Sequence, residues 1–76
     1  MPKTIFINID NYQFQILLSQ FNQNILIRRD GFSVFISEKE IKDNYSMSVL
    51  ISEELNINYL LYKNVLNRVS KLRMFL

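Results

Sequence analysis

The sequence contains no cysteine and no histidine, and only one glycine among its 76 residues. Without cysteine there is no disulfide framework and no thiolate chemistry. Without histidine, the commonest zinc ligand and the usual proton shuttle at neutral pH are both missing. A single glycine also excludes a glycine-rich phosphate-binding loop. The lack of cysteine fits an intracellular protein, so we expect a cytoplasmic location.

The acidic residues do not form a plausible catalytic pair. Glu38 and Glu40 lie two residues apart at an expected helix start, so their side chains do not face each other. Acidic residues in a first helical turn complement the helix dipole, which explains their position without catalysis. Glu53 and Glu54 are expected on a solvated helix face. We therefore expect no enzymatic activity, no metal site and no cofactor.

Long apolar runs are absent as well, so no stretch is predicted to span a membrane and no membrane partner is expected. The first ten residues lack the apolar core of a signal peptide, because Asn8 and Asp10 interrupt it. A hydrophobic fraction of 49% is ample for a folded core. The length predicts one domain, residues 1–76, with β-hairpins in 1–36 and a helical part in 37–76.

Alternating apolar residues on both sides of Asp10 and Asn11 predict a first hairpin with a two-residue turn. The pairs are Ile9 with Tyr12, Ile7 with Phe14 and Ile5 with Ile16 on one face, and Asn8 with Gln13 and Phe6 with Gln15 on the other. An alternative stays open for residues 12–21, in which Asp10 caps a helix. Its apolar positions at helical spacing are Phe14, Leu17, Leu18 and Phe21.

Asp30 and Gly31 predict a second hairpin with a type I′ turn. The pairs are Arg29 with Phe32, Ile27 with Val34 and Ile25 with Ile36 on one face, and Leu26 with Phe35 and Arg28 with Ser33 on the other. Residues 19–23 form a polar connection in which Phe21 is the expected anchor. Two hairpins, each with one apolar face, make a four-stranded antiparallel meander that needs a cover.

The helical part supplies that cover. Ser37 and Glu40 fit a capping box, and Ile41 and Tyr45 continue a short helix after it. Two further helices are predicted downstream. We therefore expect an α+β fold, a four-stranded antiparallel meander followed by two or three C-terminal helices packed on one face.

Two helices joined by a tight turn are predicted over residues 48–71. Asn56 ends the first helix in the left-handed conformation, and Asn58 caps the second. The apolar positions of the first helix are Met47, Leu50, Ile51 and Leu55. The second helix has an apolar face of Tyr62, Val65, Leu66, Val69, Leu72 and Leu76. Its opposite face holds Leu60, Lys63, Asn64, Asn67, Lys71 and Met74.

This pair resembles a helix-turn-helix DNA-binding unit. The resemblance rests on the small Ser52 at the helix crossing, on the turn residues 55–57, and on Tyr62 and Val65 returning to the core. It implies that the second helix enters the major groove, with asparagines suited to reading adenine. The implied nucleic-acid contacts are Asn58, Tyr59, Lys63, Asn64 and Asn67, with Arg68 and Lys71 near phosphate.

Charge is unevenly distributed along the chain. Residues 55–76 carry four basic residues and no acidic one, a net charge of +4 within an overall +2. Such polarity suggests an acidic partner, although cations near a helix C-terminus also complement its dipole. Arg28 and Arg29, expected at an exposed hairpin tip, would extend the basic surface. Their alternative role is to discourage aggregation at a strand edge.

Two functions follow from these patterns. The first is a small nucleic-acid-binding regulator, expected to be dimeric. The second is a small protein-binding inhibitor or adaptor, of a phage-type or anti-defence-like kind, that docks on a larger host protein. The apolar side chains expected on outer faces are Phe6, Leu26, Phe35, Leu60 and Met74, and they would support a homodimer or docking. The protein interface in the second reading consists of Tyr59, Leu60, Phe35 and Met74.

Overall fold

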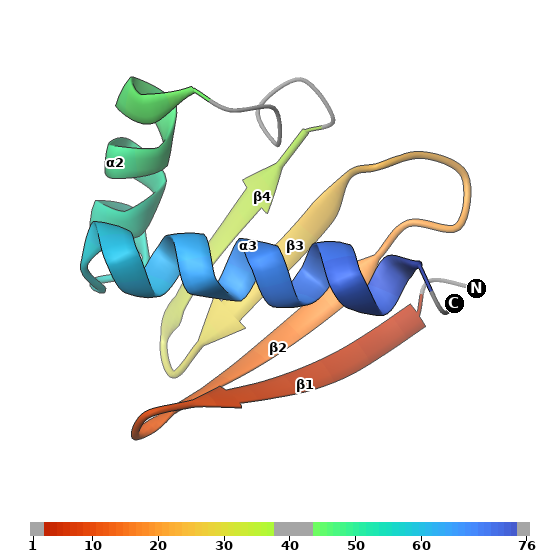
Figure 1. The fold of residues 1–76 in the computed structure, drawn as a ribbon, viewed down its shortest axis with the longest axis horizontal. Coiled ribbons are helices and arrows are strands. Elements are labelled where there is room, and N and C mark those ends of the chain that lie inside the picture. Colours follow the sequence, from red (N-terminus) through yellow and green to blue (C-terminus); the bar gives the residue numbers. More distant parts are fainter. Residues whose placement is uncertain (1–2, 38–43, 75–76) are drawn as a thin grey trace.

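The computed structural model describes residues 3–37 and 44–74, and it places them in a sheet layer and a helical layer (Figure 1). The sheet is antiparallel with the strand order β1-β2-β3-β4, so each strand pairs with its neighbour in sequence. The strands are β1 Lys3–Ile9, β2 Tyr12–Leu18, β3 Ile25–Arg29 and β4 Phe32–Ile36. The helices are α2 Tyr45–Glu54 and α3 Tyr59–Arg73. The predicted α+β meander with helices on one face is confirmed.

The predicted register is confirmed in both hairpins. Ile7 lies opposite Phe14 in the first hairpin, and Ile27 lies opposite Val34 in the second. The alternative helix over residues 12–21 is wrong, because residues 12–18 form β2 and pair on both sides, with β1 and with β3. The alternation of apolar and polar residues therefore decided the structure here, since one register buries the apolar face of both strands.

Both hairpin turns place their left-handed residue at an aspartate. Asp10 has φ 54° and Asp30 has φ 50°, whereas Gly31 does not have a positive φ. A type I′ turn requires positive φ at both central residues, so that prediction for Asp30 and Gly31 is wrong. Aspartate tolerates the left-handed region because its short polar side chain bonds locally. The only glycine of the chain is consequently not needed for the backbone conformation of its turn.

Replacing Gly31 with alanine is therefore expected to preserve the fold and to raise the free energy of unfolding by about 0.4–1 kcal/mol, because the unfolded chain loses conformational freedom. No atom lies within 4 Å of a Cβ added at Gly31, so the methyl group has room. Urea unfolding measures the change, with Asp30→Ala as the destabilised control. A loss of more than about 1 kcal/mol in Gly31→Ala would show that the position needs glycine.

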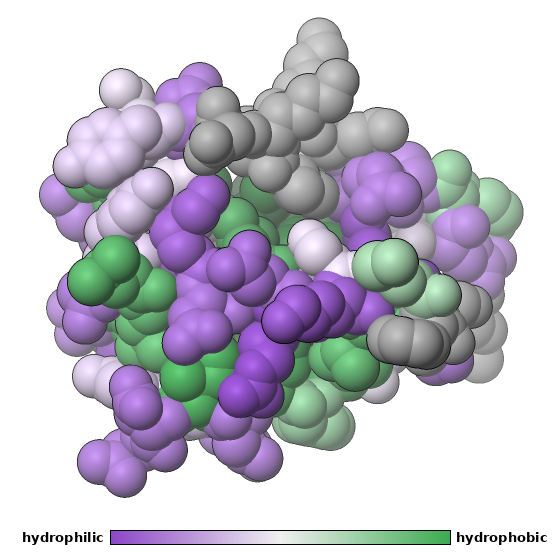
Figure 2. Space-filling view, viewed as in Figure 1, coloured by the Kyte–Doolittle hydropathy of each residue, from purple (hydrophilic) through white to green (hydrophobic). Residues whose placement is uncertain are grey.

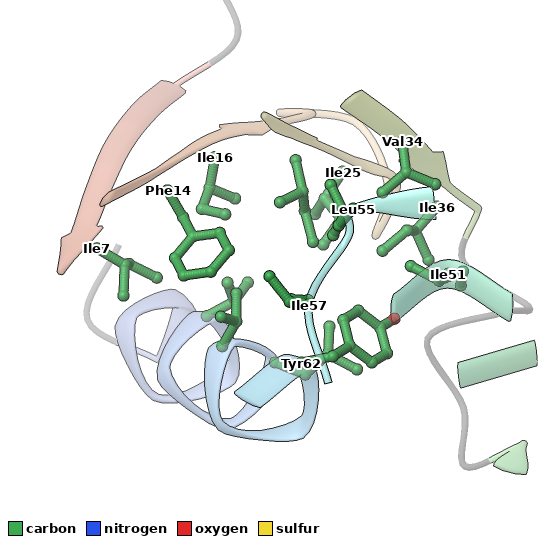
Figure 3. Close-up of a cluster of buried hydrophobic side chains, with 14 of the residues drawn as sticks. Ile7, Phe14, Ile16, Ile25, Val34, Ile36, Ile51, Leu55, Ile57 and Tyr62 are labelled. Carbon is green, nitrogen blue, oxygen red and sulfur yellow. The ribbon is translucent and has the colours of Figure 1, made fainter. Parts of the chain in front are cut away.

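The core lies between the inward face of the sheet and the two helices (Figure 3). Ile7, Phe14 and Ile16 point from the sheet toward α3, and the Tyr62 ring extends from α3 toward α2. Phe14 and Tyr62 are both completely buried. The other buried apolar side chains are Ile9, Leu18, Ile25, Ile27, Val34, Ile36, Ile51, Leu55, Ile57, Leu61, Val65, Leu66 and Val69. The predicted apolar face of the second helix is thus confirmed from Tyr62 to Val69.

Some predicted anchors lie at the surface. Phe21 is 85% exposed, so it does not anchor the β2–β3 connection. Leu50 is 54% exposed, because α2 packs through Ser48, Ile51 and Ser52 instead. Serine is small enough for close approach of a second element, and the Ser52 hydroxyl donates a hydrogen bond to the Val49 carbonyl at 2.7 Å. Leu72, also predicted on the buried face of α3, is partly exposed.

The start of the helical part falls largely outside the described residues. The capping box of Ser37 and Glu40, and the short helix beginning near Ile41, include residues that the structure does not describe. Asn44 is described, and its side chain caps α2 by accepting a hydrogen bond from the Met47 amide at 3.1 Å. Of the helices in residues 3–37 and 44–74, none is both long and apolar enough to cross a membrane.

Candidate nucleic-acid interface

A tight turn of residues 55–58 joins α2 to α3, as predicted. Asn56 is left-handed with φ 55°, and its amide donates to the Glu53 carbonyl at 3.0 Å. The Ile57 amide donates to the Ser52 carbonyl at 3.0 Å. These two hydrogen bonds and the left-handed residue define a Schellman motif, which ends a helix and satisfies its last carbonyls. The side chain of Ile57 is buried and fixes the direction of the chain into α3.

Asn58 begins α3 as predicted. Its side-chain oxygen accepts a hydrogen bond from the Leu61 amide at 2.7 Å, as an N-cap should. The oxygen of that amide is therefore occupied within the protein. A two-bond contact to adenine needs both the oxygen and the nitrogen of an asparagine. Asn58 therefore positions α3 and does not read a base in that way.

The outward face of α3 is polar over most of its length (Figure 2). Asn64, Asn67, Arg68 and Lys71 are exposed, and Lys63 and Tyr59 are half-buried. Asn64, Asn67 and Lys71 follow the spacing that keeps side chains on one helical face. The structure thus brings five predicted contacts onto one continuous surface, which we call the α3 face: Lys63, Asn64, Asn67, Arg68 and Lys71.

Positive charge on α3 increases toward its C-terminus, because Arg68, Lys71 and Arg73 lie in its last two turns. Arg73 turns toward the β2–β3 connection and donates to the carbonyls of Gln23 at 3.1 Å and Asn24 at 3.4 Å, and to the Gln23 side chain. This arginine holds the helix end against the sheet layer. Arg68 and Lys71 are the exposed cations of this end of the helix.

Acidic residues lie near the other end of α3. Glu53 and Glu54 are exposed at the end of α2. Asp10 lines a groove of about 450 Å³ beside the start of α3, together with Tyr59, Leu60 and Asn64. Carboxylates repel phosphate, so the electrostatics favour a polyanion at the C-terminal half of the helix. No group of three or more acidic side chains in the described residues is arranged to hold a metal ion.

Arg29 is not at an exposed hairpin tip, and that prediction is wrong. Its side chain is buried, and its Nε donates to the Leu55 carbonyl at 3.0 Å. Its Nη2 donates to the Asn56 carbonyl at 3.2 Å, and its Nη1 pairs with Asp30 at 2.9 Å. These contacts join the second hairpin to the turn between α2 and α3. Arg29 therefore cannot contact a nucleic acid without breaking them.

Two aromatic rings complete the site of Arg29. The guanidinium carbon lies 5.0 Å from the ring centroid of Tyr12 and 5.0 Å from that of Phe32. Arginine suits such a site because its planar group stacks on rings and donates hydrogen bonds at its edge. The signal was present in the sequence: the period of two places Arg29 on the same face as Ile25 and Ile27.

Arg28 lies on the opposite face of the sheet from α3. It is exposed, and it pairs with Gln15 and Ser33 at positions between the inward-facing ones. The predicted basic surface, in which Arg28 and Arg29 extend the α3 face, is therefore not assembled. The α3 face contains only the basic residues of the helix itself.

The four residues predicted for a protein interface are not brought together either. Phe35 is exposed on the outer face of the sheet, away from α3. Leu60 and Met74 are 77% and 82% exposed, but they stand near opposite ends of α3, about 20 Å apart at 1.5 Å per residue. Tyr59 packs on Tyr45, with ring centroids 5.1 Å apart. Leu60 and Tyr59 are the two that remain close.

Comparisons of the sequence with protein-family models and with curated proteins, and of the fold with solved structures, found no match.

Proposed function

We propose that the protein is a small, non-enzymatic nucleic-acid-binding protein that contacts duplex DNA through the α3 face. The observation that supports this most is the composition of that face. α3 has 15 residues without one acid, and its exposed polar side chains are two amides, two cations and one serine, alongside the exposed Leu60 and Leu72. A helix of this composition, attached by a tight turn to a preceding helix, is the kind of element that enters a major groove.

The α3 face offers two kinds of contact. Asn64 and Asn67 have exposed amides, which can donate to and accept from the edge of adenine. Arg68 and Lys71 provide charge for phosphates, which gives affinity and register without sequence information. The cations stand beside the amides along the helix, so a phosphate contact at the C-terminal half would leave both asparagines over the bases.

Charge reversal at Arg68 is expected to weaken binding to mixed-sequence duplex DNA about tenfold or more at low salt, because one phosphate contact becomes repulsive. Fluorescence polarisation at low and physiological salt measures the affinity and its salt dependence. Arg28→Glu is the matched control, since it makes the same change at an exposed arginine on the opposite face.

Arg28→Glu should retain nearly the wild-type affinity for duplex, and the wild type should bind more weakly as salt rises. If Arg68→Glu and Arg28→Glu weaken binding equally, the affinity depends on the net charge of the protein and not on the α3 face. No binding of the wild type to duplex at low salt would refute the proposal.

A second function, a protein-binding inhibitor or adaptor, is favoured by one observation. Leu60 is 77% exposed and lines the groove together with Asp10 and Tyr59. Exposed apolar surface beside a tyrosine suits a protein interface, since tyrosine is one of the residue types that interfaces favour. The same titration separates the two functions, because a protein-binding module of this kind needs no affinity for DNA at any salt concentration.

A further inference from the structure

The sheet has a second face, which points away from α2 and α3. Strand alternation places Phe6, Leu17, Leu26, Arg28 and Phe35 on it. Phe6 is 61% exposed and Phe35 is 60% exposed. We call this surface the outer sheet face. None of the described helices covers it, because both helices pack on the inward face.

The register determines how these side chains are arranged. Phe6, Gln15 and Arg28 lie in one row across β1, β2 and β3. Leu17, Leu26 and Phe35 lie in the next row across β2, β3 and β4. With strands about 4.8 Å apart, the two phenylalanines are roughly 16 Å apart, at opposite edges of the face. Arg28 and the two leucines occupy the surface between them.

We propose that the outer sheet face binds single-stranded nucleic acid, with bases stacked on Phe6 and Phe35 and a phosphate held by Arg28. Exposed aromatic rings on a sheet are suited to unpaired bases, since every base has a flat face that can stack. The bases of a duplex are already stacked on one another, so they cannot use these rings. This site is separate from the α3 face and does not depend on it.

Charge favours a polyanion over a second copy of the chain on this face. The outward-facing strand positions include Arg28 but no carboxylate, although Asp10 and Asp30 lie in the adjoining turns. β3 is an inner strand, so a two-fold axis near the middle of the face would bring Arg28 toward the Arg28 of the second copy. Neither arginine would find an acid on the facing strands, whereas a phosphate backbone supplies the missing charge.

The test is a polarisation titration of the full chain with labelled oligothymidine and with a mixed-sequence single-stranded RNA. Phe6→Leu and Phe35→Leu keep an apolar side chain but remove the ring, so each is expected to weaken binding about tenfold. Phe6→Tyr and Phe35→Tyr keep the ring and should retain the affinity. Circular dichroism of each variant shows that the fold is kept, as expected for side chains that are mostly exposed.

The outcomes distinguish this site from the α3 face. If both proposals hold, Phe35→Leu lowers affinity for single strands and not for duplex, whereas Arg68→Glu acts mainly on duplex. Unchanged single-strand binding in both leucine variants would overturn the proposal. So would a dimer in sedimentation equilibrium that Phe6→Ala or Phe35→Ala converts to a monomer, because the face would then hold a second copy.

Discussion

Replacing Arg29 with alanine is expected to lower the free energy of unfolding by about 2–4 kcal/mol, the largest effect of any charged residue in the described part of the chain. The side chain is buried, and it donates hydrogen bonds to the backbone carbonyls of Leu55 and Asn56. Its removal leaves these acceptors without their donor and opens a space between the rings of Tyr12 and Phe32. The ion pair with Asp30 adds little, because that carboxylate is 82% exposed.

Urea and thermal unfolding measure the change. For a domain of this size, each kcal/mol corresponds to about 4–8 °C in Tm, so a decrease of at least roughly 8 °C is expected. Arg28→Ala is the matched control, since it removes the adjacent, exposed arginine and should change stability by less than about 0.5 kcal/mol. Arg29→Lys should fall between the two, because lysine keeps the charge but cannot stack or bridge both carbonyls. Equal stabilities of the two alanine variants would contradict the structure.

Arg29→Ala also tests whether Arg29 fixes the orientation of α3. Arg29 contacts the turn that sets the direction of α3, and it does so from the second hairpin. A loss of DNA binding in Arg29→Ala would therefore report a displaced helix and not a lost phosphate contact. The salt dependence separates the two, because a residue that does not touch phosphate leaves its slope unchanged.

The fold could be predicted from the sequence where a local residue pattern is compatible with only one structure. The first hairpin has a single register that puts apolar residues opposite one another in both strands, and that register is the observed one. The turn between the helices was equally determined by Asn56 and Asn58, whose side chains favour a helix end and a helix cap. In each case the relevant interactions lie within a few residues along the chain.

The predictions of burial were wrong where contacts between distant segments of the chain determine which side chains are buried. Leu50 has the spacing of a core residue, but α2 packs through its serines, and only the position of α2 beside β4 determines this. Phe21 is 85% exposed, and its apolar character alone could not show that the β2–β3 connection holds it away from the core. The prediction that Arg28 and Arg29 lie together at an exposed hairpin tip is wrong for Arg29, because alternation places neighbouring strand residues on opposite faces. Its carbonyl acceptors lie 26 and 27 residues away along the chain.

The candidate site was predicted in part for the same reason. Helical spacing was sufficient to place Asn64, Asn67 and Lys71 on one exposed face. Helical spacing could not show that Arg73 turns toward the β2–β3 connection. Strand alternation, in contrast, does place Arg28 on the face of the sheet opposite Arg29. The proposed duplex site is therefore smaller than the sequence suggested and confined to one helix.

Replacing Phe14 with alanine is expected to be still more damaging, by about 3–5 kcal/mol. Phe14 is completely buried on the inner strand β2, opposite Ile7, and its ring stacks near Tyr12 with centroids 6.1 Å apart. A protein of 76 residues has a total stability of about 4–11 kcal/mol, so this variant loses a large part of it. Its urea midpoint should fall steeply, and at 37 °C it should be largely unfolded if the wild type lies at the lower end of that range.

Phe6→Ala makes the same change on the neighbouring strand and is the matched control. Phe6 is 61% exposed on the outer sheet face, so its loss should cost less than about 1 kcal/mol. The pair tests the orientation of the sheet, because a slip of one residue in register would exchange its two faces. Equal losses in Phe14→Ala and Phe6→Ala would mean that both faces are covered, and the outer sheet face would then be unavailable to any ligand. A large loss in Phe14→Ala alone supports an inward apolar face and an outward face open to solvent.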